Sequence, residues 1–148
     1  MGISRTVRDR VRAAALNRCG YCHAPQVLVL GPLEIEHLLP EVRGGGDDED
    51  NLWLACSVCN SHKATKVSAE DPSNHCEVPL FNPRHQSWNS HFQWDVDGAH
   101  LLGVTSIGRA TIVVLHLNDD QSVSLRTVWV SYGAFPPHDD ARSTVIQR

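Results

Sequence analysis

Two C-x-x-C pairs constrain this chain more than any other feature: Cys19 with Cys22, and Cys56 with Cys59. Two such pairs supply the four thiolates of a tetrahedral zinc site, in which no position remains for a reactive water. Two disulfides are the alternative, but disulfides are rare in a reducing cytosol. We therefore expect a structural zinc ion that closes a loop around the whole intervening segment. Cys76 stands alone and is expected to be a buried or incidental thiol.

Length and composition fit an ordinary globular protein. The chain has 148 residues, of which 41% are hydrophobic and 20% charged, which is enough apolar material for a core. No apolar run approaches the roughly 18 residues that cross a bilayer, and the N-terminal segment lacks the apolar stretch of a secretory signal. We therefore expect no membrane association and a cytoplasmic location.

The charge balance argues mildly against nucleic-acid binding. The formal net charge is −4, whereas phosphate recognition depends on Lys and Arg. The basic residues are unevenly distributed, because the first eighteen residues contain five arginines opposed only by Asp9. These arginines could form a local basic face where the whole molecule cannot. They are Arg5, Arg8, Arg10, Arg12 and Arg18.

The first half of the chain predicts a helix followed by a hairpin with a long loop. Ser4 can cap a helix that runs to about Asn17, with apolar residues at helical spacing. A β-prone run from Leu33 to Leu39 ends at a proline, and after a glycine-rich acidic loop an apolar run covers Leu52 to Ala55. The segment after Cys59, residues 60–70, is compatible with a short helix. The local order is strand, strand, helix.

The second half predicts a further hairpin and two helices. Asp97 and Gly98 form a turn between two β-prone runs. Ser106 can cap a helix to about Leu117, and a last helix is expected over residues 122–132.

These elements predict an α+β fold in two regions. Residues 1–72 would form a core that the structural zinc site stabilises. Residues 73–148 would form an extension that packs on this core as one globular unit.

Three sequence motifs lie between and beside the cysteine pairs: E-H-L-L-P at residues 36–40, G-G-G-D-D-E-D at 44–50, and N-L-W-L-A-C-S-V-C-N-S-H-K at 51–63. Together with the zinc cysteines, they resemble the small bacterial HNH endonucleases of the ββα-metal superfamily. The runs LFNPR at 80–84 and IGRAT at 107–111 resemble the C-terminal extension of such proteins. The resemblance therefore covers nearly the whole chain.

The resemblance implies a division of roles among polar residues. His37 would be the general base, and an imidazole, which ordinarily titrates near ~6.5, suits the task. Glu36 and Asn60 would hold a catalytic Mg²⁺ or Mn²⁺ through hard oxygen ligands. Asn51 would bridge the hairpin loop and keep the base in place.

Two features complicate this site. The family more often has Asp at the position of Glu36. Moreover, Glu36 and His37 are neighbours on a strand, and successive side chains of a strand point to opposite faces. Both can reach one site only if the end of the strand turns them together.

Lys63, Lys66 and Arg84 are the candidate contacts to nucleic acid. The acidic residues 47–50 are expected to form a solvated loop without a metal.

The predicted function is hydrolysis of DNA phosphodiester bonds with a divalent metal and a histidine base. The partner would be duplex or branched DNA. Many such enzymes nick one strand per site, so double-strand cleavage would need a homodimer or two events. The alternative is a zinc-stabilised nucleic-acid-binding or structural module without catalysis.

Overall fold

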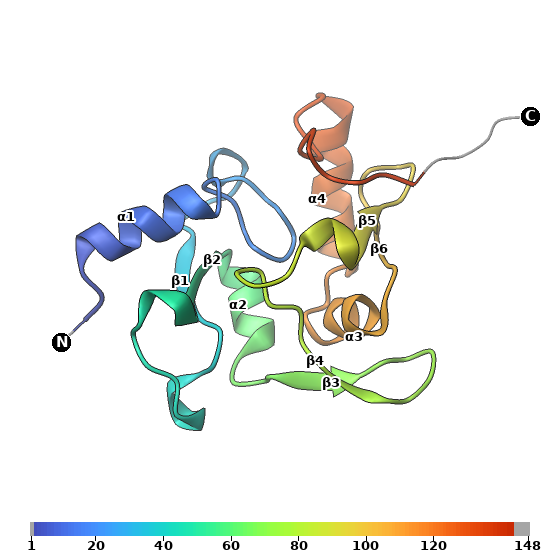
Figure 1. Ribbon diagram of the computed structural model, residues 1–148. Helices are drawn as coiled ribbons and strands as arrows, with labels where there is room; N and C mark the ends of the chain where they lie inside the picture. Colours follow the sequence, from blue (N-terminus) through green and yellow to red (C-terminus); the bar gives the residue numbers. More distant parts are fainter. Residues whose placement is uncertain (1, 144–148) are drawn as a thin grey trace, which may run out of the picture. The chain divides into compact units, whose positions relative to one another are not determined.

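The mixed α and β class predicted from the sequence is confirmed by the computed structural model, which describes residues 2–143 (Figure 1). The chain divides into two compact units. The first reaches Val67 and includes Asn82–Gln86, and the second comprises Ser68–Phe81 and the chain from Ser87 on. Within residues 2–143, no helix has the length and apolar character needed to cross a membrane. The predicted packing of residues 73–148 on the core stays a prediction.

The first unit begins with helix α1 (Arg5–Ala14). Ser4 caps it as predicted, because its side chain accepts a hydrogen bond from the backbone N–H of Val7 at 3.2 Å. The helix ends earlier than predicted. Leu16 and Asn17 have left-handed backbones with φ of 56° and 53°, which an α-helix does not accommodate.

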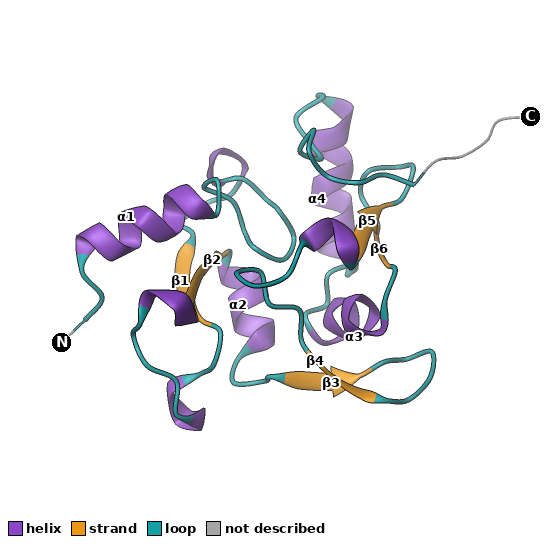
Figure 2. Ribbon diagram, viewed as in Figure 1, coloured by secondary structure: helices purple, strands orange, loops and turns teal. Residues whose placement is uncertain are grey.

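Strands β1 (Glu34–His37) and β2 (Leu52–Ala55) pair antiparallel and are followed by helix α2 (Ser57–Lys63), so the predicted order of strand, strand and helix is confirmed (Figure 2). In their register, Glu34 lies opposite Ala55 and His37 opposite Leu52. Leu52, Leu54 and Ala55 are fully buried, so β2 forms part of the core of this unit.

The helix predicted over residues 60–70 is wrong in its bounds. It begins earlier because Cys56 is its N-cap, with Sγ accepting a hydrogen bond from the N–H of Cys59. It ends at Lys63 because Ala64 has a φ of 49°, outside the helical region. The chain beyond it forms a strand, Ser68–Glu70.

Among its described residues, the second unit contains two hairpins and two α-helices. The turn at Gly98, where φ is 69°, joins the second hairpin as predicted. The first helix begins at Ser106, but its cap is Thr105 and not the predicted Ser106. The second begins at Asp120 after its cap Asp119, two residues before the predicted start at Ser122. The elements are β3 (Ser68–Glu70), β4 (Glu77–Pro79), β5 (Phe92–Trp94), β6 (Leu101–Gly103), α3 (Ser106–Val114) and α4 (Asp120–Ser131).

Aromatic side chains fill the core of the second unit. Phe81 meets Phe92 edge to face with ring centroids 5.1 Å apart, and Trp94 meets Phe135 at 5.0 Å. Trp88 is buried beside Trp94. These rings are therefore packed as a core, and they do not form a surface for stacking on nucleic-acid bases.

Candidate functional site

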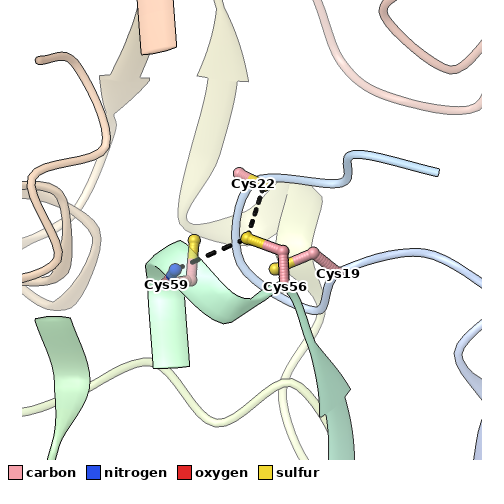
Figure 3. A group of neighbouring side chains, drawn as sticks. All are labelled: Cys19, Cys22, Cys56 and Cys59. Atoms are coloured by element: carbon pink, nitrogen blue, oxygen red, sulfur yellow. Dashed lines mark hydrogen bonds between the residues drawn. The ribbon is translucent and has the colours of Figure 1, made fainter. Parts of the chain in front are cut away.

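The four cysteines of the C-x-x-C pairs meet in one buried cluster (Figure 3). Cys19 and Cys22 lie on the loop after α1, Cys56 lies between β2 and α2, and Cys59 lies in α2. Their sulfur atoms lie within 4.8 Å of one another, with 3.8 Å between those of Cys22 and Cys56. A tetrahedron with zinc–sulfur bonds of about 2.3 Å has edges of about 3.8 Å. The cluster is therefore positioned to hold a zinc ion.

The surroundings of these thiols do not by themselves favour four negative charges. Burial raises the pKa of the Cys19 thiol, and hydrogen bonds from the neighbouring thiols raise that of Cys59. Hydrogen bonds from the same group lower the pKa of Cys56. A divalent cation would allow all four sulfurs to be thiolates together. Cys76 lies outside this cluster and is exposed. Of the two expectations for this residue, a buried thiol is therefore wrong.

An open pocket of about 360 Å³ lies where the end of β1 faces α2. Its lining includes Glu36 and His37 from β1 and Asn60 from α2. The two strand neighbours thus reach the same pocket although successive strand residues point to opposite faces. The three residues predicted to carry the metal and the base are brought together here.

The two oxygens of the buried Glu36 carboxylate differ in their hydrogen bonding. Its side chain is 2% exposed. Oε1 accepts hydrogen bonds from the Tyr21 hydroxyl at 2.8 Å and from the Lys63 ammonium at 2.9 Å. Oε2 is buried and has no hydrogen-bond partner among the described residues. Burial raises the pKa of Glu36, and the Lys63 charge opposes this effect.

His37 contacts the acidic loop that follows β1. Its Nε2 lies 2.7 Å from Oδ1 of Asp47 and 3.7 Å from Oε1 of Glu41. Asp47 belongs to the run that was expected to be only solvated, so its contact with His37 was missed. Ligand atoms of His37, Glu41 and Asp47 all lie within 4.8 Å of one another, which makes them a second group that could hold a metal.

Asn51 fixes the loop that brings Asp47 to His37. Its Oδ1 accepts a hydrogen bond from the Leu39 N–H at 2.9 Å. Its Nδ2 donates to the carbonyls of Leu39 at 3.0 Å and Gly46 at 2.9 Å. Gly45 allows this closure, because a Cβ there would lie 1.7 Å from the Leu39 carbonyl oxygen. The loop is therefore folded back onto the end of β1.

Asn60 presents its amide group beside Glu34. Its Nδ2 donates to Oε1 of Glu34 at 2.8 Å, which directs the amide nitrogen to the carboxylate and leaves the carbonyl oxygen as the atom suited to a cation. The sequence motif did not point to Glu34. Its position two residues before Glu36, on the same face of β1, was the available signal.

The three candidate nucleic-acid contacts differ in position. The Lys63 side chain is 3% exposed, and its ammonium also donates to the carbonyls of His37 and Leu38, so we expect it to stabilise the site and not to contact phosphate. The Arg84 guanidinium donates to the Leu52 carbonyl, and its buried Nη2 has no hydrogen-bond partner within residues 2–143. Lys66 is exposed.

The predicted basic face of α1 is partly engaged within the first unit. Arg10 forms an ion pair with Glu49 at 2.6 Å. Arg12 donates to the Leu33 carbonyl at 3.3 Å. These contacts reduce the positive charge that α1 can offer to a phosphate backbone.

Residues 19–66 match the family model of the HNH endonucleases. This segment begins at the first zinc cysteine and contains β1, β2 and α2, and we identify it as an HNH endonuclease domain. The match ends before the second unit begins. No curated protein and no solved structure matches the chain.

Proposed function

We propose that this protein is a metal-dependent endonuclease that hydrolyses phosphodiester bonds in DNA. The observation that carries the proposal is the pocket of the HNH domain, which His37, Glu36 and Asn60 line together and in which the buried Oε2 of Glu36 has no hydrogen-bond partner among the described residues. A buried carboxylate oxygen without a partner is costly unless a ligand compensates it.

The donor atoms in this pocket fit a hard divalent cation. Glu36 offers a carboxylate oxygen and Asn60 an amide carbonyl, both of which suit Mg²⁺ or Mn²⁺. The cysteine thiolates are soft ligands that suit zinc and not Mg²⁺. A divalent cation bound there would supply positive charge that stabilises the scissile phosphate and the leaving oxygen.

His37 is the proposed general base. A hydrogen bond donated by its Nε2–H to Asp47 leaves the lone pair of Nδ1 free, and Nδ1 then takes the proton from the attacking water. Asn51 supports this arrangement because it holds the loop that carries Asp47. Its contribution is to position the base.

The family of the domain supports DNA as the proposed substrate, in duplex or branched form. An HNH domain with one proposed histidine base suits nicking of one strand, so double-strand cleavage would need two copies or two events. Zinc held by four thiolates suits a reducing compartment, and we propose the cytoplasm.

The direct test is cleavage by purified protein with Mg²⁺ or Mn²⁺, using plasmid, single-stranded and branched DNA and a matched RNA. We expect DNA cleavage that chelation abolishes and added metal restores. A protein that holds zinc and binds DNA but cuts none of these substrates would be a binding or structural module instead.

A further inference from the structure

Tyr21 connects the zinc-binding loop with the proposed catalytic pocket. It lies between Cys19 and Cys22 in the sequence and is fully buried. Its hydroxyl donates to Oε1 of Glu36 at 2.8 Å. A single side chain therefore reaches from the zinc cluster to the carboxylate proposed to bind the catalytic metal.

Two backbone hydrogen bonds hold the chain at Tyr21. The N–H of Gly20 donates to the Leu54 carbonyl of β2 at 2.8 Å, and the N–H of Tyr21 donates to Sγ of Cys19 at 3.4 Å. No side chain larger than hydrogen fits at Gly20, because a Cβ there would lie 2.3 Å from the Trp53 ring. The position of the hydroxyl thus depends on the zinc loop and on its packing against β2.

The hydrogen bonds to Glu36 are asymmetric in a way that suits metal binding. Both donors, the Tyr21 hydroxyl and the Lys63 ammonium, bind Oε1. Oε2 has no hydrogen-bond partner among residues 2–143. If either donor held Oε2, a cation would have to displace it. The observed arrangement instead fixes the carboxylate and leaves one oxygen available.

We propose that Tyr21 is a positioning residue for the catalytic metal: the zinc loop carries its hydroxyl to Oε1 of Glu36, so that Oε2 binds the divalent cation. Zinc binding and catalytic-metal affinity are then coupled through one hydrogen bond. The inference rests on the proposed function, because it needs Glu36 to be the metal ligand. Hydrogen-bond partners of metal ligands typically contribute 10- to 100-fold in metal affinity.

The experiment measures Mn²⁺ binding by electron paramagnetic resonance to the zinc-loaded protein. Tyr21→Phe removes only the hydroxyl, and Tyr132→Phe is the matched control because Tyr132 is 84% exposed. We expect Tyr21→Phe to raise the Mn²⁺ Kd about tenfold while zinc content and melting temperature stay near the wild-type values. Excess Mn²⁺ should restore binding. The control should match the wild type.

A double-mutant cycle with Glu36→Gln tests whether Tyr21 changes the Mn²⁺ affinity through Glu36. Glu36→Gln alone should weaken Mn²⁺ binding, and adding Tyr21→Phe to it should weaken binding no further. The inference is overturned if Tyr21→Phe binds Mn²⁺ like the wild type, if it loses zinc and cooperative unfolding together with Mn²⁺, or if Glu36→Gln has no effect. If the binding results hold but no DNA is cut, the inference stands and the proposed function fails.

Discussion

At the scale of single residues, Asp47 offers a direct test of how His37 is held. Its carboxylate lies 2.7 Å from Nε2 of His37. If Asp47 orients the base, Asp47→Asn should lower the single-turnover cleavage rate about tenfold or more without changing the Mn²⁺ Kd. Asp48→Asn, in the same exposed loop, is the matched control. A rise in the Mn²⁺ Kd of Asp47→Asn would instead place the metal at His37, Glu41 and Asp47.

The sequence predicted the residues that stand in fixed motif positions and missed the ones that reach the site across a loop. His37 and Asn60 followed from the motif positions that the resemblance to HNH endonucleases implies, and both line the pocket. Asp47 and Tyr21 did not, because their contacts depend on how the loop after β1 and the zinc loop close. Lys63 was predicted to contact nucleic acid, but its side chain is buried and its ammonium lies 2.9 Å from Oε1 of Glu36.

At the scale of elements, the strands of the HNH domain were predicted more accurately than the helix ends, whereas β3 was predicted as helix and β4 was not predicted. Apolar runs bounded by proline and a glycine-rich loop located β1 and β2. The end of α2 could not be predicted, because the polar residues after Lys63 are compatible with either helix or strand. The left-handed backbone of Ala64 decides the outcome.

The contact between Asp71 and Arg109 predicts a pH-dependent stability for the second unit. Asp71 follows β3 and is fully buried, and Arg109 of α3 donates to both its oxygens at 2.8 and 3.1 Å. These hydrogen bonds hold the pKa of Asp71 well below its usual range. The resulting stabilisation is present above the ordinary value of ~3.9 and is lost as the pH falls through the lower folded-state value.

Arg109→Gln should therefore lower the melting temperature by several degrees at pH 7, and the difference from the wild type should shrink below about pH 4. Thermal unfolding followed by circular dichroism between pH 3 and 7 measures this difference. A difference that stays constant over this range would show that Arg109 acts through packing and not through the Asp71 charge.

At the scale of the whole molecule, the net charge is unevenly divided between the two units. The first unit has nine Lys and Arg against eight Asp and Glu, and the second has four against nine. The acidic excess that argued against nucleic-acid binding therefore belongs to the second unit. The HNH domain lies in the unit without that excess.

The zinc cluster is expected to stabilise the first unit as a whole, because it joins the loop after α1 to the start of α2. Metal analysis should find about one zinc per chain, and Cys59→Ser should remove it and strongly lower the melting temperature. Cys76→Ser, outside the cluster, is the matched control. A zinc-free protein with the wild-type melting temperature would contradict this expectation.

The measurement that tests the central claim most directly is single-turnover cleavage of DNA at saturating Mn²⁺ by the wild type, His37→Ala and the control His75→Ala. The side chain of His75 is 77% exposed and lies in the second unit. We expect His37→Ala to cut about 10²- to 10⁴-fold more slowly, with unchanged zinc content and DNA affinity, and His75→Ala to cut at the wild-type rate. Cleavage by His37→Ala at the wild-type rate would contradict the assignment of His37 as the base.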